Sequence, residues 1–197
     1  MNTVQLNLFS VPVIHYEDFL PLELVQNIKK YVLTRTDTVA PHFAISKPGV
    51  STHHNLSLDL IREITSLVEG CSQFYNNIMT CVDDYTTKTG LPKTVLTNSW
   101  FNIQQPGSVL RRHMHAGGYA VVAGALYINV DNKSSPLVFE NPNPYCLLNT
   151  RNQMDQITIK PTSGDLILFP SWLVHSSVEP NMTENRIVIS FNTDSTT

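Results

Sequence analysis

Cysteine, positive charge and long apolar runs are all scarce in this sequence. Its three cysteines show no CxxC spacing, which argues against a disulfide framework or a zinc knuckle and predicts a reduced, cytoplasmic setting. Thirteen lysines and arginines and a net charge of −3 offer no broad basic surface for nucleic acid or an anionic membrane. No run approaches the roughly 18 apolar residues of a membrane span, and the first residues lack a basic leader region. We therefore expect a soluble protein that is not exported.

The length and apolar content set the scale of the fold. A chain of 197 residues with 42% hydrophobic content suits one domain with a sizeable core, without an internal repeat or a linker. We expect residues 1–93 to hold an N-terminal strand and helices, and residues 94–193 to hold a β core.

The N-terminal segment begins with β-rich residues and continues into a helical pattern. Val4–Phe9 and Val11–Tyr16 are rich in strand formers interrupted by Ser10, and they predict an edge strand. From Pro21 the apolar residues recur at helical spacing, which predicts a helix to about Arg35.

Residues 36–56 have no sustained period and contain two prolines and a glycine, so we interpret them as a loop. A loop of this length can act as a lid over a site. His42, His53 and His54 lie in it, and we interpret them as solvated, with substrate contact as the alternative.

A second helical pattern begins after Ser57, which is a suitable N-cap, and ends at Gly90 and Pro92. Its apolar stripe holds for seven turns, which predicts one long amphipathic helix that packs against another layer.

The second half of the chain changes to short β-rich runs separated by turn residues. Two helices before about eight such strands predict a mainly β, double-stranded β-helix, a cupin-like jelly roll with the long helix covering one outer face. The expected strands are Val95–Gln104, Val109–His115, Ala120–Val130, Pro136–Phe139, Gln156–Ile159, Asp165–Phe169, Val174–Val178 and Arg186–Thr193.

Three histidines stand in a suggestive order within this half. His113 and His115 are two residues apart on an extended segment, so their side chains point the same way. His175 follows much later, on a strand that we expect to meet the first across the barrel. Three neutral imidazoles suit Fe, Zn, Cu or Ni and leave coordination positions open. Arg186, further on, shares a strand face with Ser190, where a guanidinium and a hydroxyl can meet one carboxylate.

The order HxH, then GDLILFPSWLVHSSVEPN, then RIVISFN resembles the 2-oxoglutarate and Fe(II)-dependent oxygenases, in particular small oxygenases of bacteria and phages. This resemblance implies Fe(II), 2-oxoglutarate and O2 as cofactors and a small-molecule or peptide substrate that is hydroxylated. It implies that Arg186 and Ser190 anchor the cosubstrate, with Tyr127 and Asn102 as further contacts, and that no catalytic residues are needed beyond the metal ligands.

One position departs from the pattern of the superfamily. Where the superfamily has a carboxylate ligand, this chain has His115, so the resemblance implies a metal site of His113, His115 and His175. Glu140 is the nearest acidic alternative as a ligand. Neutral imidazole in place of a carboxylate leaves the site one unit more positive, which should tighten anion binding.

Two other functions fit parts of the pattern. Gly107 before the histidine pair, and Gly164 and Pro170 before His175, resemble the two motifs of a three-histidine cupin-type dioxygenase that uses no 2-oxoglutarate. The glutamate of the first cupin motif is absent, and Arg186 has no role in that interpretation. A jelly roll that binds a metal or an acidic ligand without turnover is the other alternative.

Overall fold

Two antiparallel sheets face each other in the computed structural model of the chain, which describes residues 10–35, 39–42, 44–46, 48–55, 59–115, 120–143 and 155–195. The larger sheet has the order β1 (Ile14–Tyr16), β8 (Leu166–Pro170), β5 (Ala120–Asn129), β10 (Arg186–Ser195), β3 (Thr94–Gln104) and β2 (Val50–Ser51). The smaller sheet has the order β4 (Leu110–His113), β9 (His175–Ser177), β6 (Leu137–Glu140) and β7 (Gln156–Ile159). All eight expected runs form strands, and the predicted jelly roll is confirmed.

The helical prediction is right for the first helix and wrong for the second. Helix α1 spans Leu22–Thr34, but the expected long helix is two helices, α2 (Leu60–Leu67) and α3 (Phe74–Thr89). The break contains Gly70 with φ of 79°, a left-handed conformation that glycine adopts without steric cost. A Cβ at this position would lie 2.7 Å from Leu24 Cδ2, so the turn also allows α1 to approach closely.

Asp59 caps α2, because its side chain accepts a hydrogen bond from the Arg62 N–H. The expected cap, Ser57, lies outside the described residues.

Cys146 also lies outside the described residues. Cys71 and Cys81 are free thiols. None of the helices within the described ranges is long and apolar enough to cross a membrane.

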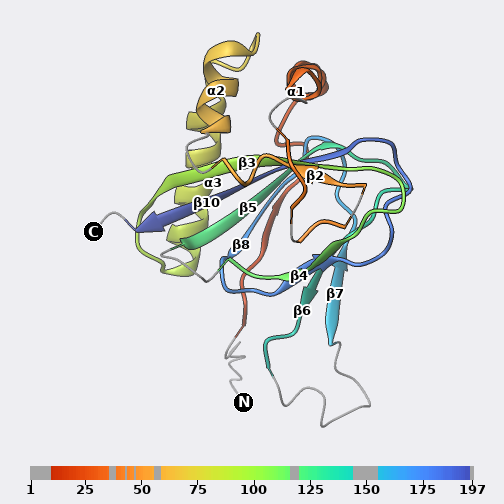
Figure 1. Ribbon diagram of the computed structural model, residues 1–197. Helices are drawn as coiled ribbons and strands as arrows, with labels where there is room; N and C mark the ends of the chain where they lie inside the picture. The colour runs from red at the N-terminus through yellow and green to blue at the C-terminus, as the bar shows by residue number, and fades with distance from the viewer. Residues whose placement is uncertain are drawn as a thin grey trace, which may run out of the picture.

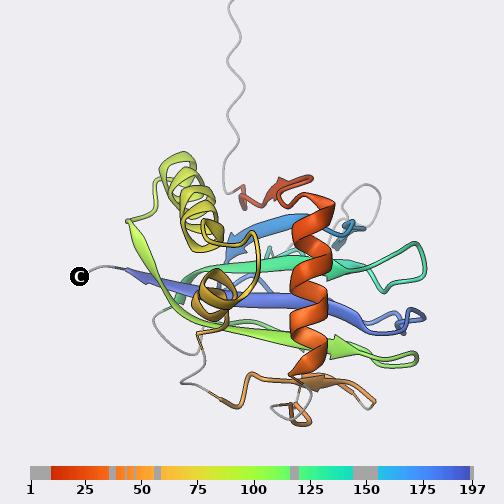
Figure 2. The ribbon, with the colours of Figure 1, turned by 90° about the horizontal axis from the view of Figure 1, so that it is seen from above.

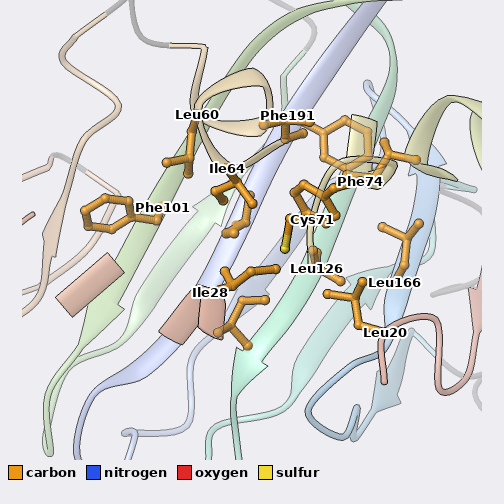
Figure 3. Close-up of a cluster of buried hydrophobic side chains, with 14 of the residues drawn as sticks. Leu20, Ile28, Leu60, Ile64, Cys71, Phe74, Phe101, Leu126, Leu166 and Phe191 are labelled. Atoms are coloured by element: carbon orange, nitrogen blue, oxygen red, sulfur yellow. The ribbon is translucent and has the colours of Figure 1, made fainter. Parts of the chain in front are cut away.

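The three helices cover one face of the larger sheet, and α1 crosses its strands in Figure 2. Helix and sheet side chains share one buried cluster, in which Ile28, Ile64 and Phe74 meet Leu126 and Phe191 (Figure 3). Both halves of the broken helix contribute to this cluster, which explains why the apolar stripe continues across the break.

Successive side chains of β10 point alternately into the helix-side cluster and into the interior between the two sheets. Ile187, Ile189 and Phe191 belong to the helix-side cluster, whereas Val188 belongs to a second cluster with Tyr127. Because successive side chains on a strand point to opposite faces, the neighbours of Val188 with the same parity also face the interior. This inner face is where the polar residues of the C-terminal motif gather.

The N-terminal prediction is confirmed where the chain is described. β1 pairs only with β8 and forms an edge of the larger sheet, while Val4–Phe9 lies outside the described residues. The 36–56 segment is not purely a loop, because it supplies β2, which pairs with β3 at the opposite edge. This pairing joins residues far apart in sequence, so no local pattern signals it.

The carboxylate of Asp165, just before β8, is buried and joins the N-terminal strand to the turn that precedes β8. It accepts hydrogen bonds from the Thr162 N–H at 2.7 Å and the Asp18 N–H at 3.1 Å, and it lies 2.9 Å from His15 Nε2. Burial raises the pKa of Asp165, but the contacts with Thr162, His15 and Asp18 outweigh burial, so the net pKa falls below its ordinary value of 3.8.

Asp165→Asn should therefore lower the free energy of unfolding at pH 7 by about 1.5–3 kcal/mol, the range for hydrogen bonds to a charged group. A pKa that is lower in the folded state stabilises above the unfolded pKa, and this stabilisation is lost as pH falls through the folded pKa. The difference between wild type and variant in urea unfolding should accordingly shrink below about pH 4. Asp83→Asn, on an exposed helical position, is the control. An equal deficit at pH 7 and pH 3 would show that the charge of Asp165 is not what stabilises the fold.

Candidate metal and cosubstrate site

The three predicted histidines meet at one end of the interior. His113 at the end of β4 and His175 at the start of β9 are directly opposed partners in the smaller sheet. His115 follows two residues after His113, and its N–H donates to the Ser171 carbonyl at 2.8 Å. One ring nitrogen from each histidine lies within 4.8 Å of the others. Strand pairing therefore unites residues that are far apart in sequence.

Each imidazole is oriented by a contact at Nδ1. His113 Nδ1 lies 2.8 Å from the Arg111 carbonyl, and His175 Nδ1 lies 2.9 Å from the Leu173 carbonyl. His115 Nδ1 lies 2.6 Å from Asn192 Oδ1. A carbonyl oxygen only accepts, so in each ring Nδ1 carries the proton and Nε2 presents a lone pair. Partners of this kind fix the tautomer of a metal-binding histidine.

Burial keeps these rings uncharged at neutral pH. It lowers the pKa of His113, lowers the pKa of His115 to about 4, and lowers the pKa of His175 well below its ordinary value. Repulsion from neighbouring imidazoles adds to the pKa shifts of His115 and His175. Neutral imidazole is the form that coordinates a metal, so this set of nitrogens fits Fe(II).

Glu140 does not join the cluster. It ends β6, and its Oε1 accepts from Arg112 Nε at 2.5 Å. Among the described residues, the group suited to a metal consists of His113, His115 and His175 only. The structure thus brings His115, and not the acidic alternative, to this position.

The four residues predicted to contact the cosubstrate lie on the inner face of the larger sheet. In the register, Val188 of β10 opposes Asn102 on one side and Tyr127 on the other. Asn102 Nδ2 donates to Ser190 Oγ at 3.3 Å. Arg186 and Asn192 lie on the same face of β10, near its two ends. Asn192 is the residue whose Oδ1 contacts His115 Nδ1.

Arg186 is a buried cation without an acidic partner. It is 3% exposed, and no carboxylate among the described residues lies within ion-pair distance of it. Its Nε donates to the Ser135 carbonyl at 3.2 Å, and its Nη1 donates to Gln104 Oε1 at 2.5 Å. The guanidinium carbon lies 5.6 Å from the ring centroid of Tyr127. Because a buried unpaired charge is costly, this arrangement favours an anionic ligand.

A cavity of about 310 Å³ lies against the histidine cluster. Among its lining residues, His53 packs edge-to-face on Trp100 and on His42, with both ring-centroid distances at 4.6 Å. The prediction of solvated rings is therefore wrong for His42 and His53, while His54 is exposed. The cavity is lined by His42, His53, Trp100, Asn102, Leu110, His113, Met114, His115 and Asn192.

The segment that carries His42 and His53 is bonded to both sheets. Ala40 and Ser51 exchange two backbone hydrogen bonds of 2.9 Å, and β2 pairs with β3. The Arg111 N–H donates to the Ala44 carbonyl at 2.6 Å. These bonds favour a fixed wall of the cavity over the movable lid that the sequence predicts.

Comparison with known proteins agrees with this geometry. Residues 98–192 match the model of a family described as "Putative 2OG-Fe(II) oxygenase". The matched region holds the histidine cluster, Arg186 and the strands that place them. The region that carries the site therefore matches a family of 2-oxoglutarate and Fe(II)-dependent oxygenases. This class of non-heme iron dioxygenase uses Fe(II), 2-oxoglutarate and O2. No curated protein matches the sequence.

Solved oxygenase structures share the fold at low sequence identity. A Pseudomonas putida prolyl-4-hydroxylase has 16% identity and a TM-score of 0.65, with 94% of each chain covered. The viral collagen prolyl hydroxylase of Paramecium Bursaria Chlorella virus-1, in a 2-oxoglutarate complex, has 12% identity and a TM-score of 0.60, covering 93% of this chain and 96% of that one. HygX from Streptomyces hygroscopicus, with nickel and 2-oxoglutarate bound, has 14% identity and a TM-score of 0.60, covering 94% and 84%. These similarities support the double-stranded β-helix.

Asn192 gives a first test of the cluster in this oxygenase. Asn192→Leu removes the acceptor at His115 Nδ1, so the ring loses its fixed orientation and divalent metal affinity should fall about ten- to a hundredfold. Asn192→Asp keeps an acceptor oxygen and should retain the affinity. Anaerobic calorimetric titration with Fe(II), and with Co(II) as a stable substitute, measures both. Wild-type affinity in Asn192→Leu would exclude this orienting role.

Proposed function

We propose that this oxygenase couples oxidative decarboxylation of 2-oxoglutarate to hydroxylation of a small molecule or a peptide. The observation that carries the proposal is the uncompensated Arg186 guanidinium, buried on the same inner face that ends at the histidine cluster. A dicarboxylate with a 2-oxo acid at one end would satisfy both features at once. Hydroxylation is proposed because two of the compared structures are hydroxylases by name.

His113, His115 and His175 would hold Fe(II) through Nε2, with Nδ1 of each ring held by its carbonyl partner. Iron held there would supply open coordination positions for the 2-oxo acid end of 2-oxoglutarate and for dioxygen. An all-imidazole set leaves the site one unit more positive than a set with a carboxylate, which favours binding of an anionic cosubstrate.

Arg186 and Ser190 would anchor the distal carboxylate of the cosubstrate, with Asn102 and Tyr127 alongside it. Burial raises the pKa of Tyr127 to about 12, against a lowering effect of Arg186. The phenol therefore stays protonated at neutral pH and remains a hydrogen-bond donor. These residues hold and orient a ligand, while the surrounding apolar cluster excludes water from it.

The substrate group to be oxidised would enter the cavity bounded by His42, His53 and Trp100. Among its described lining residues there is no aspartate, glutamate, lysine or arginine, and burial lowers the pKa of His53 and lowers the pKa of His42 to about 4. An uncharged lining favours an uncharged reacting group.

The test begins without oxygen. Titration of 2-oxoglutarate into the iron-loaded protein should produce a metal-to-ligand charge-transfer band, and admission of O2 should then convert 2-oxoglutarate to succinate. A cupin-type dioxygenase would bind iron and form no such chelate, and a binding module would yield no succinate. Absence of the band at millimolar 2-oxoglutarate would overturn the proposal.

A further inference from the structure

Gln104 ends β3 directly beside the buried guanidinium. It is the register partner of Arg186, it is 1% exposed, and its Oε1 accepts from Arg186 Nη1. The sequence shows only that Gln104 shares a strand face with Asn102. Its contact with Arg186 depends on the pairing of β3 with β10.

This contact fixes which way the amide points. A guanidinium has donors and no acceptor, so the amide atom in contact with Arg186 must be the oxygen and not Nε2. Nε2 is buried, and among the described residues it has no hydrogen-bond partner. Buried donors are ordinarily paired, so an unpartnered one calls for an explanation.

A second unpartnered group belongs to a residue that contacts the same arginine. Ser135 accepts from Arg186 Nε through its carbonyl, and its buried hydroxyl has no partner among the described residues. An amide N–H donor, a hydroxyl and a buried cation thus occur together on neighbouring residues. A carboxylate supplies only acceptors, with about four lone-pair positions on two oxygens, and it complements all three.

We infer that Gln104 is a second anchor for the distal carboxylate of the cosubstrate and sets the preference for dicarboxylic over monocarboxylic 2-oxo acids. Gln104 Oε1 holds the guanidinium in place while Nε2 donates to the carboxylate. The inference rests on the proposed function, because it concerns the same cosubstrate.

The test compares two acids on the iron-loaded protein without oxygen. 2-Oxoglutarate has the distal carboxylate, and 2-oxobutanoate has the same metal-binding end without it. Gln104→Glu is nearly isosteric, but it places a carboxylate against Arg186 and presents no donor to the ligand. Its affinity for 2-oxoglutarate should fall by more than about a hundredfold, the combined effect of a lost charged hydrogen bond and a neutralised anchor. Its affinity for 2-oxobutanoate should change less than about twofold, because no group at the metal end is altered.

Gln105→Glu is the matched control. It makes the same change in charge at the next residue, whose Nε2 donates to Asn185 Oδ1 and whose Oε1 has no recorded contact with Arg186. It should keep the wild-type preference for 2-oxoglutarate. Gln104→Met keeps the side-chain length without adding charge, and it should weaken 2-oxoglutarate about ten- to a hundredfold; it decides the question if Gln104→Glu does not fold.

The outcomes separate the two proposals. If the wild type forms a chelate with neither acid, the proposed function fails. If the wild type prefers 2-oxoglutarate and the folded Gln104 variants keep that preference, only the role of Gln104 fails. If the affinities for both acids fall equally in these variants, Gln104 supports the fold and does not bind the distal carboxylate. That result would also overturn the inference.

Discussion

Alanine at His113, His115 or His175 is expected to abolish stoichiometric Fe(II) binding while the fold is retained. Each substitution removes one of three nitrogens that lie within 4.8 Å of one another, and two imidazoles hold a divalent ion far more weakly than three. The fold should persist because an open catalytic metal site does not have to drive folding. His175 is the most buried of the three and packs on Phe169, so its variant should also lose some stability.

Anaerobic titration with Fe(II) measures occupancy, and circular dichroism with thermal unfolding reports on the fold. His54→Ala, at an exposed position outside the cavity, is the matched control and should bind one equivalent of iron. Full iron occupancy in His115→Ala would remove that residue from the site. In that case, loss of iron in the double variant with Glu140→Gln would identify Glu140 as the third ligand, and full occupancy in the double variant would point to water.

Arg186→Lys is expected to weaken 2-oxoglutarate binding by about ten- to a hundredfold, or about 1.5–3 kcal/mol. Lysine keeps the charge but cannot reproduce the planar fork, which in the structure is held by Ser135 and Gln104 on two of its nitrogens. Iron affinity should be unchanged, because Arg186 lies at the opposite end of the inner face from Asn192 and His115.

The measurement is the charge-transfer titration under anaerobic conditions, with iron affinity determined separately. Arg112→Lys makes the same exchange at an exposed arginine, paired with Glu140, and should leave both affinities at wild-type values. Identical 2-oxoglutarate affinities in wild type and Arg186→Lys would refute the anchor and leave the cupin or binding-module interpretation.

The local pattern of apolar residues was sufficient to predict much of the fold. Alternating β-rich runs placed all eight core strands, because the period of two is a property of each strand by itself. Helical spacing placed α1 equally well. The same spacing gave a wrong prediction between α2 and α3. The apolar stripe continues on both sides of Gly70, so the stripe does not show that the backbone turns at this residue.

The sequence by itself determined which side chains could form the site: a histidine pair on one extended segment, a distant histidine, and an arginine in phase with Ser190 on a strand. Only the tertiary structure decided what surrounds them. The opposition of His113 and His175, the hold of Asn192 on His115, the contact of Gln104 with Arg186, and the His53 ring on Trp100 all depend on strand pairing between distant segments. Periodicity reports which face of a strand a residue occupies, but it carries no information about which strand lies beside it, because register is set by packing across the whole sheet.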